Sequence, residues 1–201
     1  MESCRPTDIP VGLSRICVFA GSSMGRSEAY RNAAKKLGQT IARCGLGMVY
    51  GGARVGLMGA AADAALAEGG EVIGVLPKKL ANLEIAHDGL TRLHLVDTMH
   101  ERKAIMANLS DAFIALPGGI GTLEETFEVL TWSQLGFHLK PVGLLNVEGF
   151  FDRLLGFLDD LSTERFLKTE HRSLLLSDSD PDRLISRVLQ ANVTHIPKWI
   201  D

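Results

Sequence analysis

Short apolar runs alternate along this chain with longer segments of helical periodicity, and glycine or proline punctuates the alternation. This order of elements is typical of βαβ units. The runs lack the regular polar positions of a strand with one wet face, so they indicate strands buried on both sides. The sequence therefore predicts a doubly wound, Rossmann-like α/β fold with a parallel sheet and helices on both faces. The expected strands are 15–20, 47–50, 71–76, 92–96, 112–116 and 142–145, with 174–177 as a weaker one.

Apolar residues at helical spacing occupy the segments between these runs. Two such sets are Ala33, Leu37, Ile41 and Cys44, and Phe151, Leu154, Leu158 and Leu161. Asp180 followed by Pro181 matches an N-cap with proline at the first helical position, which predicts a last helix that carries Leu184 and Ile185.

The chain has 201 residues, which fits a single domain over 1–201. We expect residues 1–12 and 193–201 to be loosely held. A net charge of −3 provides no basic surface for a nucleic-acid backbone. The longest stretch without a charged residue, 112–123, is too short to span a bilayer, and the N-terminus lacks the apolar run of a secretory signal. We therefore expect a cytoplasmic protein with no nucleic-acid or membrane partner.

The cysteines and histidines show no pattern of a disulfide framework or a metal site. Cys4, Cys17 and Cys44 form an odd set without a C-x-x-C pair, and none of the histidines lies at ligand spacing. We expect no metal and no redox cofactor, and we expect Cys17 and Cys44 to be buried.

Four loops that follow predicted strands are rich in glycine or polar residues: 21–27, 51–59, 97–103 and 117–122. In an open parallel sheet, ligands bind at the carboxyl ends of the strands. We therefore place the functional site at these loops.

The loop 117–122 has the sequence PGGIGT and precedes a helix expected to begin near Leu123. Free backbone amides at the positive end of a helix favour phosphate binding. The alternative is a tight turn in which the glycines serve close packing. For the loop 51–59 this alternative is the stronger one, because Gly56 and Gly59 suit close packing of a helix on the sheet. Neither the ending of an ATP-binding loop nor the spacing of a dinucleotide fingerprint is present.

Glu125 lies three residues after Thr122, which is the spacing of a capping box. Alternatively, its carboxylate faces the sugar of a nucleotide bound at the loop, where it stabilises positive charge or activates water. The spacing alone favours neither interpretation.

Arg102 lies in a second expected helix, which Thr98 and Glu101 begin as a capping box. At helical spacing it shares an apolar, core-facing stripe with Met99 and Met106. Arginine is seldom buried without a partner, and the helix dipole disfavours a cation in the first turn. Arg102 is therefore predicted to face a carboxylate or a phosphate. The alternative is a surface arginine whose stem covers apolar surface.

These motifs together resemble the LOG (Lonely Guy) family of cytokinin riboside 5′-monophosphate phosphoribohydrolases, whose members are often labelled lysine decarboxylases. The resemblance covers about residues 16–189 and is carried by PGGIGTLEE at 117–125, MHERK at 99–103, LTWSQLG at 130–136 and KPVGLLN at 140–146. It implies hydrolysis of the N-glycosidic bond of a nucleoside monophosphate, N6-modified AMP or AMP itself, to free base and ribose 5-phosphate. It also implies a homodimer with the site near the interface.

By matching position, the resemblance makes Arg102 and Glu125 the catalytic pair. The residues that it implies in substrate and phosphate binding are Glu84, Lys103, Gly118, Gly119, Ile120, Gly121, Thr122, Leu123, Glu124 and Thr131. Further candidate nucleotide contacts are Gly21, Ser22, Gly51, Gly52 and Met99. The chain departs from the family at Ala53-Arg54, where many members have a further glycine, and these side chains are expected to alter access for the base.

Three other classes compete with this interpretation. A non-enzymatic nucleotide carrier or sensor on the same fold would keep the glycine loops without needing the Arg102 and Glu125 pair. A lysine decarboxylase needs a lysine in the setting of a pyridoxal phosphate Schiff base, which the sequence does not offer. A Rossmann oxidoreductase needs the missing fingerprint. The carrier is therefore the remaining alternative to a hydrolase.

Overall fold

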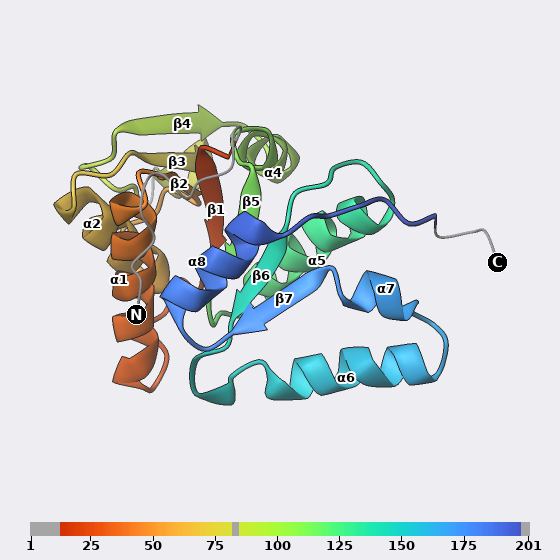
Figure 1. Ribbon diagram of the computed structural model, residues 1–201. Coiled ribbons are helices and arrows are strands. Elements are labelled where there is room, and N and C mark those ends of the chain that lie inside the picture. The colour runs from red at the N-terminus through yellow and green to blue at the C-terminus, as the bar shows by residue number, and fades with distance from the viewer. Residues whose placement is uncertain (1–12, 82–84, 198–201) are drawn as a thin grey trace.

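A seven-stranded parallel sheet forms the centre of the computed structural model, which describes residues 13–81 and 85–197 (Figure 1). The strand order is β4-β3-β2-β1-β5-β6-β7, and all neighbours in it are parallel. The strands are β1 (Arg15–Phe19), β2 (Gly47–Tyr50), β3 (Val72–Pro77), β4 (Arg92–Val96), β5 (Ala112–Ala115), β6 (Val142–Leu145) and β7 (Leu175–Asp178). The predicted strands are confirmed to within a residue at each end, and the weak run at 174–177 forms the edge strand β7.

Helices pack on both faces of the sheet, so the predicted doubly wound α/β fold is confirmed. They are α1 (Glu28–Arg43), α2 (Gly56–Ala67), α3 (Lys78–Ala81), α4 (Met99–Asn108), α5 (Ile120–Gln134), α6 (Asp152–Thr163), α7 (Thr169–Arg172) and α8 (Pro181–Gln190), with a 3-10 turn at Val147–Gly149. One core takes side chains of α1, α2 and α8, and the other takes side chains of α4, α5 and α6. Alternate residues of β1 divide between these cores, as the pleat of a strand requires. No helix in the described ranges is long and apolar enough to cross a membrane.

The two described cysteines are buried, as the sequence predicts. Cys17 lies in β1, and burial raises the pKa of its thiol well above the ordinary value. The thiol therefore stays protonated at neutral pH, and it acts in the core as a small apolar side chain.

The strand order reverses at β1, which determines where a ligand can bind. From β1 the chain adds β2, β3 and β4 on one side and then returns to place β5 on the other. Phe19 and Ala115 pair at the carboxyl ends of β1 and β5, so the loops that follow these strands start side by side. In open α/β sheets a crevice forms at such a reversal and holds the ligand. The fold therefore brings together the loops 21–27 and 117–122.

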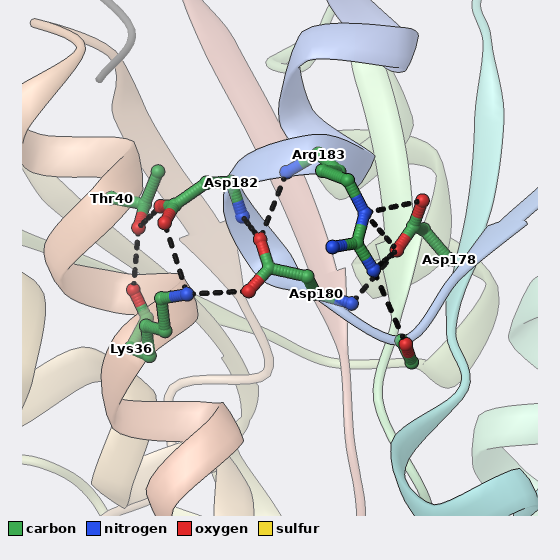
Figure 2. Close-up of polar contacts among 7 residues, drawn as sticks. Lys36, Thr40, Asp178, Asp180, Asp182 and Arg183 are labelled. Carbon is green, nitrogen blue, oxygen red and sulfur yellow. Dashed lines mark hydrogen bonds and ion pairs between the residues drawn. The ribbon is translucent and has the colours of Figure 1, made fainter. Parts of the chain in front are cut away.

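The last helix, α8, begins as predicted with Asp180 as its N-cap. The Asp180 carboxylate accepts hydrogen bonds from the amides of Asp182 and Arg183 at 3.0 and 3.1 Å. Figure 2 shows that it also meets the Lys36 ammonium of α1, 2.6 Å away, while the Thr40 hydroxyl donates to Asp182 at 2.7 Å. These contacts join the first long helix of the chain to the last.

Replacing Asp180 by alanine removes this cap and its ion pair, and we expect the free energy of unfolding at pH 7 to fall by about 1–2 kcal/mol. Burial alone would raise the pKa of Asp180, but Lys36 and the amide hydrogen bonds hold it below its ordinary value. The stabilisation is therefore complete at neutral pH. It begins to fall near pH 3.9, about the pKa of an aspartate in the unfolded chain, and it is lost as the pH falls through the lower pKa of the folded state. Urea unfolding at several pH values measures this loss.

Asp180→Asn is the matched control, because asparagine keeps a capping oxygen and loses only the charge. It should lose less stability than Asp180→Ala at pH 7. Equal losses in the two variants would contradict the capping role.

Candidate active site

Three glycine-containing loops meet at Gly21, just beyond the end of β1. Its amide donates to the Pro117 carbonyl of the loop after β5 at 3.2 Å, and its carbonyl accepts from the Leu57 amide of α2 at 3.0 Å. A Cβ on Gly118 would lie 2.9 Å from the Gly21 nitrogen, and a Cβ on Gly56 would lie 2.6 Å from the Gly21 oxygen. A side chain at either position would force the loops apart. For Gly56 the structure therefore supports the packing interpretation.

α5 begins at Ile120 with Gly119 as its N-cap, three residues before the predicted start. Of the two interpretations that the spacing of Thr122 and Glu125 leaves open, the capping box is therefore wrong. Thr122 lies within the first turn and is buried. Its hydroxyl lies against Gly118, where a Cβ would come within 2.1 Å of Oγ1. The glycine N-cap has no side chain that could bind the first amides of the helix. These amides remain available to an anion.

The tip of the loop 117–122 faces outward. A Cβ on Gly119 or on Gly121 would meet no atom within 4 Å, and Ile120 is 83% exposed. Packing therefore requires a glycine at position 118 but not at positions 119 and 121. An anion can approach the N-terminus of α5 from this open side, which is the approach that a phosphate cradle needs.

Thr98 is the N-cap of α4, and its hydroxyl accepts a hydrogen bond from the Glu101 amide at 3.1 Å. The Glu101 carboxylate accepts from the Asp97 amide at 3.0 Å, one residue before the position that a capping box specifies. The Thr98 half of this predicted box is confirmed, and the reciprocal bond is displaced by one residue. The carboxylate of Glu101 is therefore bound at the start of the helix. Arg102, the next residue, is the charged residue of the first turn that reaches the candidate site.

Arg102 joins three parts of the structure through its guanidinium. Nη1 lies 2.5 Å from Glu125 Oε1 of α5, and Nε donates to the Val75 carbonyl of β3 at 3.1 Å. A Cβ on Gly51 would lie 2.3 Å from Nη2, so the guanidinium lies against the backbone of the loop after β2. The side chains of Arg102 and Glu125 are each 11% exposed. The anion that the sequence predicts beside Arg102 is therefore the carboxylate of Glu125.

The apolar stripe predicted around Arg102 is only partly buried. Met106 is buried, whereas Met99 is 48% exposed and its Sδ lies 3.5 Å from Arg102 Nη1. The first turn of α4 borders the site, and only the later turns pack into the core. Met99 therefore lies beside Arg102 and is partly exposed, and its role as a nucleotide contact stays a prediction.

Burial raises the pKa of the Glu125 carboxyl above its ordinary value, because the carboxylate loses hydration between α4 and α5. Arg102 opposes this rise through its charge and its hydrogen bond, Glu124 adds to the rise, and Lys103 opposes it. The pKa that results is still raised. A carboxylate in this state takes up a proton more readily than an exposed one, which is the property of a general base in an active site.

Lys103, the next residue of α4, is also held by α5. Its ammonium lies 2.6 Å from Glu124 and 2.9 Å from Glu128, and its side chain is 11% exposed. Lys103 and Glu124, which the resemblance assigns to substrate binding, therefore bind each other in this structure. The sequence reasoning missed Glu128, although its spacing of four from Glu124 on a helix was an available signal.

Two predicted site residues are not placed beside the Arg102 and Glu125 pair. Thr131 lies near the other end of α5 and lines a pocket between α5 and α6 with Leu130 and Leu158. Glu84 lies outside the described residues. The structure therefore gives neither residue a position in the site.

The loop after β2, where the chain departs from the family, is bound to a neighbouring segment. Gly52 has a φ of 76°, which favours glycine, and Ala53 forms an antiparallel bridge with Ala86. The Arg54 side chain is 54% exposed, and its Nη1 lies 3.9 Å from Asp88 Oδ2. Arg54 does not contact the guanidinium of Arg102 or the loop 117–122 in any hydrogen bond or ion pair among the described residues.

The strand order, the open helix N-terminus and the glycine loops define a Rossmann-like α/β protein with a candidate anion site where the strand order reverses. The sequence profile of a family described as "Possible lysine decarboxylase" matches residues 58–188. The chain belongs to this family, the LOG family that the motifs predict.

Two curated relatives are cytokinin riboside 5′-monophosphate phosphoribohydrolases by name. The enzyme LOG from Oryza sativa subsp. japonica is 47% identical over 174 residues, which cover 87% of this chain and 72% of the relative. The enzyme from Rhodococcoides fascians is 49% identical over 174 residues, which cover 86% of this chain and 88% of the relative. The similarity therefore extends over most of both proteins.

Solved structures with the same fold include proteins named for cofactor binding. The molybdenum cofactor binding protein from Rippkaea orientalis superimposes with a TM-score of 0.64 at 29% identity and covers 88% of this chain and 95% of that chain. The molybdenum cofactor carrier protein from Chlamydomonas reinhardtii gives a TM-score of 0.68 at 24% identity, with coverage of 89% and 97%. The second likeness shows the fold alone.

Two adjacent glycines of the loop 117–122 should differ in how much stability they lose on replacement by alanine. Gly118→Ala forces a Cβ against Thr122 and the Gly21 backbone, and we expect it to cost about 1–3 kcal/mol of unfolding free energy. Gly119 has a φ of −94° and open space around it, so Gly119→Ala meets no clash and should cost only about 1 kcal/mol or less, because alanine is a poorer N-cap than glycine. Urea unfolding of both variants measures the difference. Equal destabilisation would contradict the packing role given to Gly118.

Proposed function

We propose that this protein hydrolyses the N-glycosidic bond of cytokinin riboside 5′-monophosphates, and also of AMP, to give the free base and ribose 5-phosphate. The observation that carries the proposal is the 2.5 Å contact between Arg102 and Glu125. Glu125 lies about one and a half turns along α5 from its N-terminus, which is rich in glycine and open on one side. Relatives that are nearly half identical over most of the chain bear the name of this activity.

The first step in the proposed mechanism is phosphate binding at the loop 118–122. The backbone amides and the positive end of α5 suit the 5′-phosphate, and Gly119 and Gly121 leave room for its oxygens. Binding energy gained at the phosphate positions the bond to be broken, which lies elsewhere on the nucleotide. This assignment predicts that nucleosides without the phosphate are poor substrates.

Cleavage places positive charge on the sugar, and Glu125 lies on the first turns of the helix that holds the phosphate. When the bond between C1′ and N9 breaks, its electron pair leaves with the base and the sugar becomes oxocarbenium-like. The Glu125 carboxylate stabilises this charge and accepts a proton from the water that bonds to C1′. The proton finally resides on the released base. Arg102 orients the carboxylate and offers a donor to the departing base.

Glu125→Gln keeps the size of the side chain and removes its charge and basicity, so we expect turnover to fall by about 100-fold or more. The assay follows free base and ribose 5-phosphate by chromatography, with isopentenyladenosine monophosphate, AMP and the two nucleosides as substrates. Glu164→Gln, an exposed change at the end of α6, is the matched control. Near-wild-type turnover by Glu125→Gln would contradict the catalytic role.

The same assay separates a hydrolase from a carrier. A solved structure of this fold at 29% identity is named a molybdenum cofactor binding protein, and that name mentions binding but no hydrolysis. A binding protein is therefore the alternative to test. Nucleotide binding by the wild-type protein without release of base from any substrate would favour the carrier. Faster release from the modified nucleotide than from AMP would make the modified nucleotide the substrate.

We also propose a homodimer with the site near the interface. The proposal rests on the resemblance to the family, and the structure adds that large apolar side chains border the candidate site, where Ile120 is 83% and Met99 is 48% exposed. Light scattering after size exclusion should give about twice the chain mass of 21.8 kDa. A mass of a single chain at micromolar concentration would contradict the proposal. A cytoplasmic location stays a prediction from the sequence.

A further inference from the structure

α4 and α5 meet through two adjacent cations and three carboxylates. Arg102 and Lys103 project from α4, and Glu124, Glu125 and Glu128 project from α5. The pairing is selective: Arg102 meets Glu125 alone, whereas Lys103 meets Glu124 and Glu128. The site therefore contains one ion pair that the proposed mechanism uses and a second, three-membered cluster that the mechanism does not explain.

Lys103, Glu124 and Glu128 form a cluster, called the Lys103 cluster, in which two carboxylates hold one ammonium. The Lys103 side chain is 11% exposed, and the two carboxylates beside its ammonium compensate for the hydration that the ammonium loses between the helices. Of the two carboxylates, Glu128 is 24% exposed and Glu124 is 50% exposed. Glu128 is therefore the less hydrated of the two partners, and the one that solvent screens less.

Glu128 and Lys103 also share a small cavity with Glu125. Its other lining residues are Phe19, Ala107 and Val129, which are apolar and buried. Charges across such a poorly hydrated space act on one another more strongly than charges in water. A change in the position of the Lys103 ammonium will consequently be felt at the Glu125 carboxylate.

We propose that Glu128 is a positioning residue: it holds the Lys103 ammonium away from Glu125, so that Arg102 remains the sole ionic partner of the catalytic carboxylate. This inference rests on the proposed function, in which Glu125 acts as a carboxylate. Without Glu128 the ammonium loses one of its two anchors, and Glu125 is the next carboxylate within the shared cavity.

The charged groups that face Glu125 determine the sign of the expected effect. They are Arg102 and Lys103 from α4 and Glu124 and Glu128 from α5 itself, while β1 contributes only the apolar Phe19 and the thiol of Cys17. Lys103 lowers the pKa of Glu125 against the rise that burial causes. An ammonium released toward Glu125 lowers it further, so the carboxylate persists to lower pH and becomes a weaker base.

Glu128→Gln should therefore move the titration of Glu125 toward lower pH by at least about half a unit. The direct readout is the ¹³C chemical shift of the Glu125 carboxyl carbon in glutamate-labelled protein, assigned with Glu125→Gln. The acid limb of the kcat/KM profile for isopentenyladenosine monophosphate should move the same way, with kcat reduced more than KM is changed. Thermal unfolding checks that the variant is folded.

The same substitution in a Lys103→Met variant distinguishes positioning of the Lys103 ammonium from a direct effect of the Glu128 charge on Glu125. In Lys103→Met protein no ammonium can move, so Glu128→Gln should shift the Glu125 titration by half as much or less. An equal shift in the two backgrounds would show that Glu128 acts directly on Glu125, and no shift in either would show that it does not act at all. Either result overturns the proposal.

Glu164→Gln provides the control for loss of one negative charge and should leave the Glu125 titration unchanged. The carboxyl shift is measured without substrate, so the outcome does not depend on hydrolysis. A protein that shows the Glu125 shift but releases no base from any nucleotide would contradict the proposed function and leave the role of Glu128 in place.

Discussion

The contact between Arg102 and Glu125 is the interaction on which the arrangement of the site depends. α4 follows β4 in one half of the sheet, and α5 follows β5 in the other half, so this pair connects the halves across the point where the strand order reverses. Removing two charges from water costs free energy that an ion pair alone seldom offsets. Here the guanidinium recovers part of the cost through the Val75 carbonyl. The glycine at position 51 leaves the space that the guanidinium occupies.

Much of the fold could be predicted because the relevant signals are local. Strands buried on both faces need continuous apolar runs, and the cap of α8 is a property of Asp180 and its next residues. The spacing of Thr122 and Glu125 left two interpretations open, and the structure excludes the capping box, because α5 begins at Ile120 and Thr122 lies within its first turn. The loop before this helix lies against Gly21, a residue far away in the sequence, and such a contact leaves no local signal. An anion beside Arg102 could be predicted from the cost of a buried cation, but its identity as Glu125 depends on the position of α5 relative to α4, which no local signal gives.

The fold by itself does not distinguish the chemistry of its members. Solved structures named for cofactor binding superimpose on this fold, and relatives that are nearly half identical in sequence are named phosphoribohydrolases. Glycine loops suit any ligand with a phosphate, because backbone amides recognise the anion and not the molecule that carries it. A carboxylate whose pKa is raised by burial and balanced by two nearby cations has no evident use in simple binding. The difference between the classes should therefore be sought between α4 and α5 and not in the loop 117–122.

The hydrogen bond between residues 21 and 117 has a consequence for the order of events during synthesis. β1 is made first and lies in the middle of the sheet, yet the loop that completes its crevice is made nearly a hundred residues later. A ribosome-bound chain that has completed β4 contains one half of the sheet and an unpaired edge of β1. Sheets that depend on such distant pairing fold slowly, because the loop between the partners must close first. The crevice is consequently a late product of folding, and a nascent chain cannot hold a ligand there until α5 has emerged.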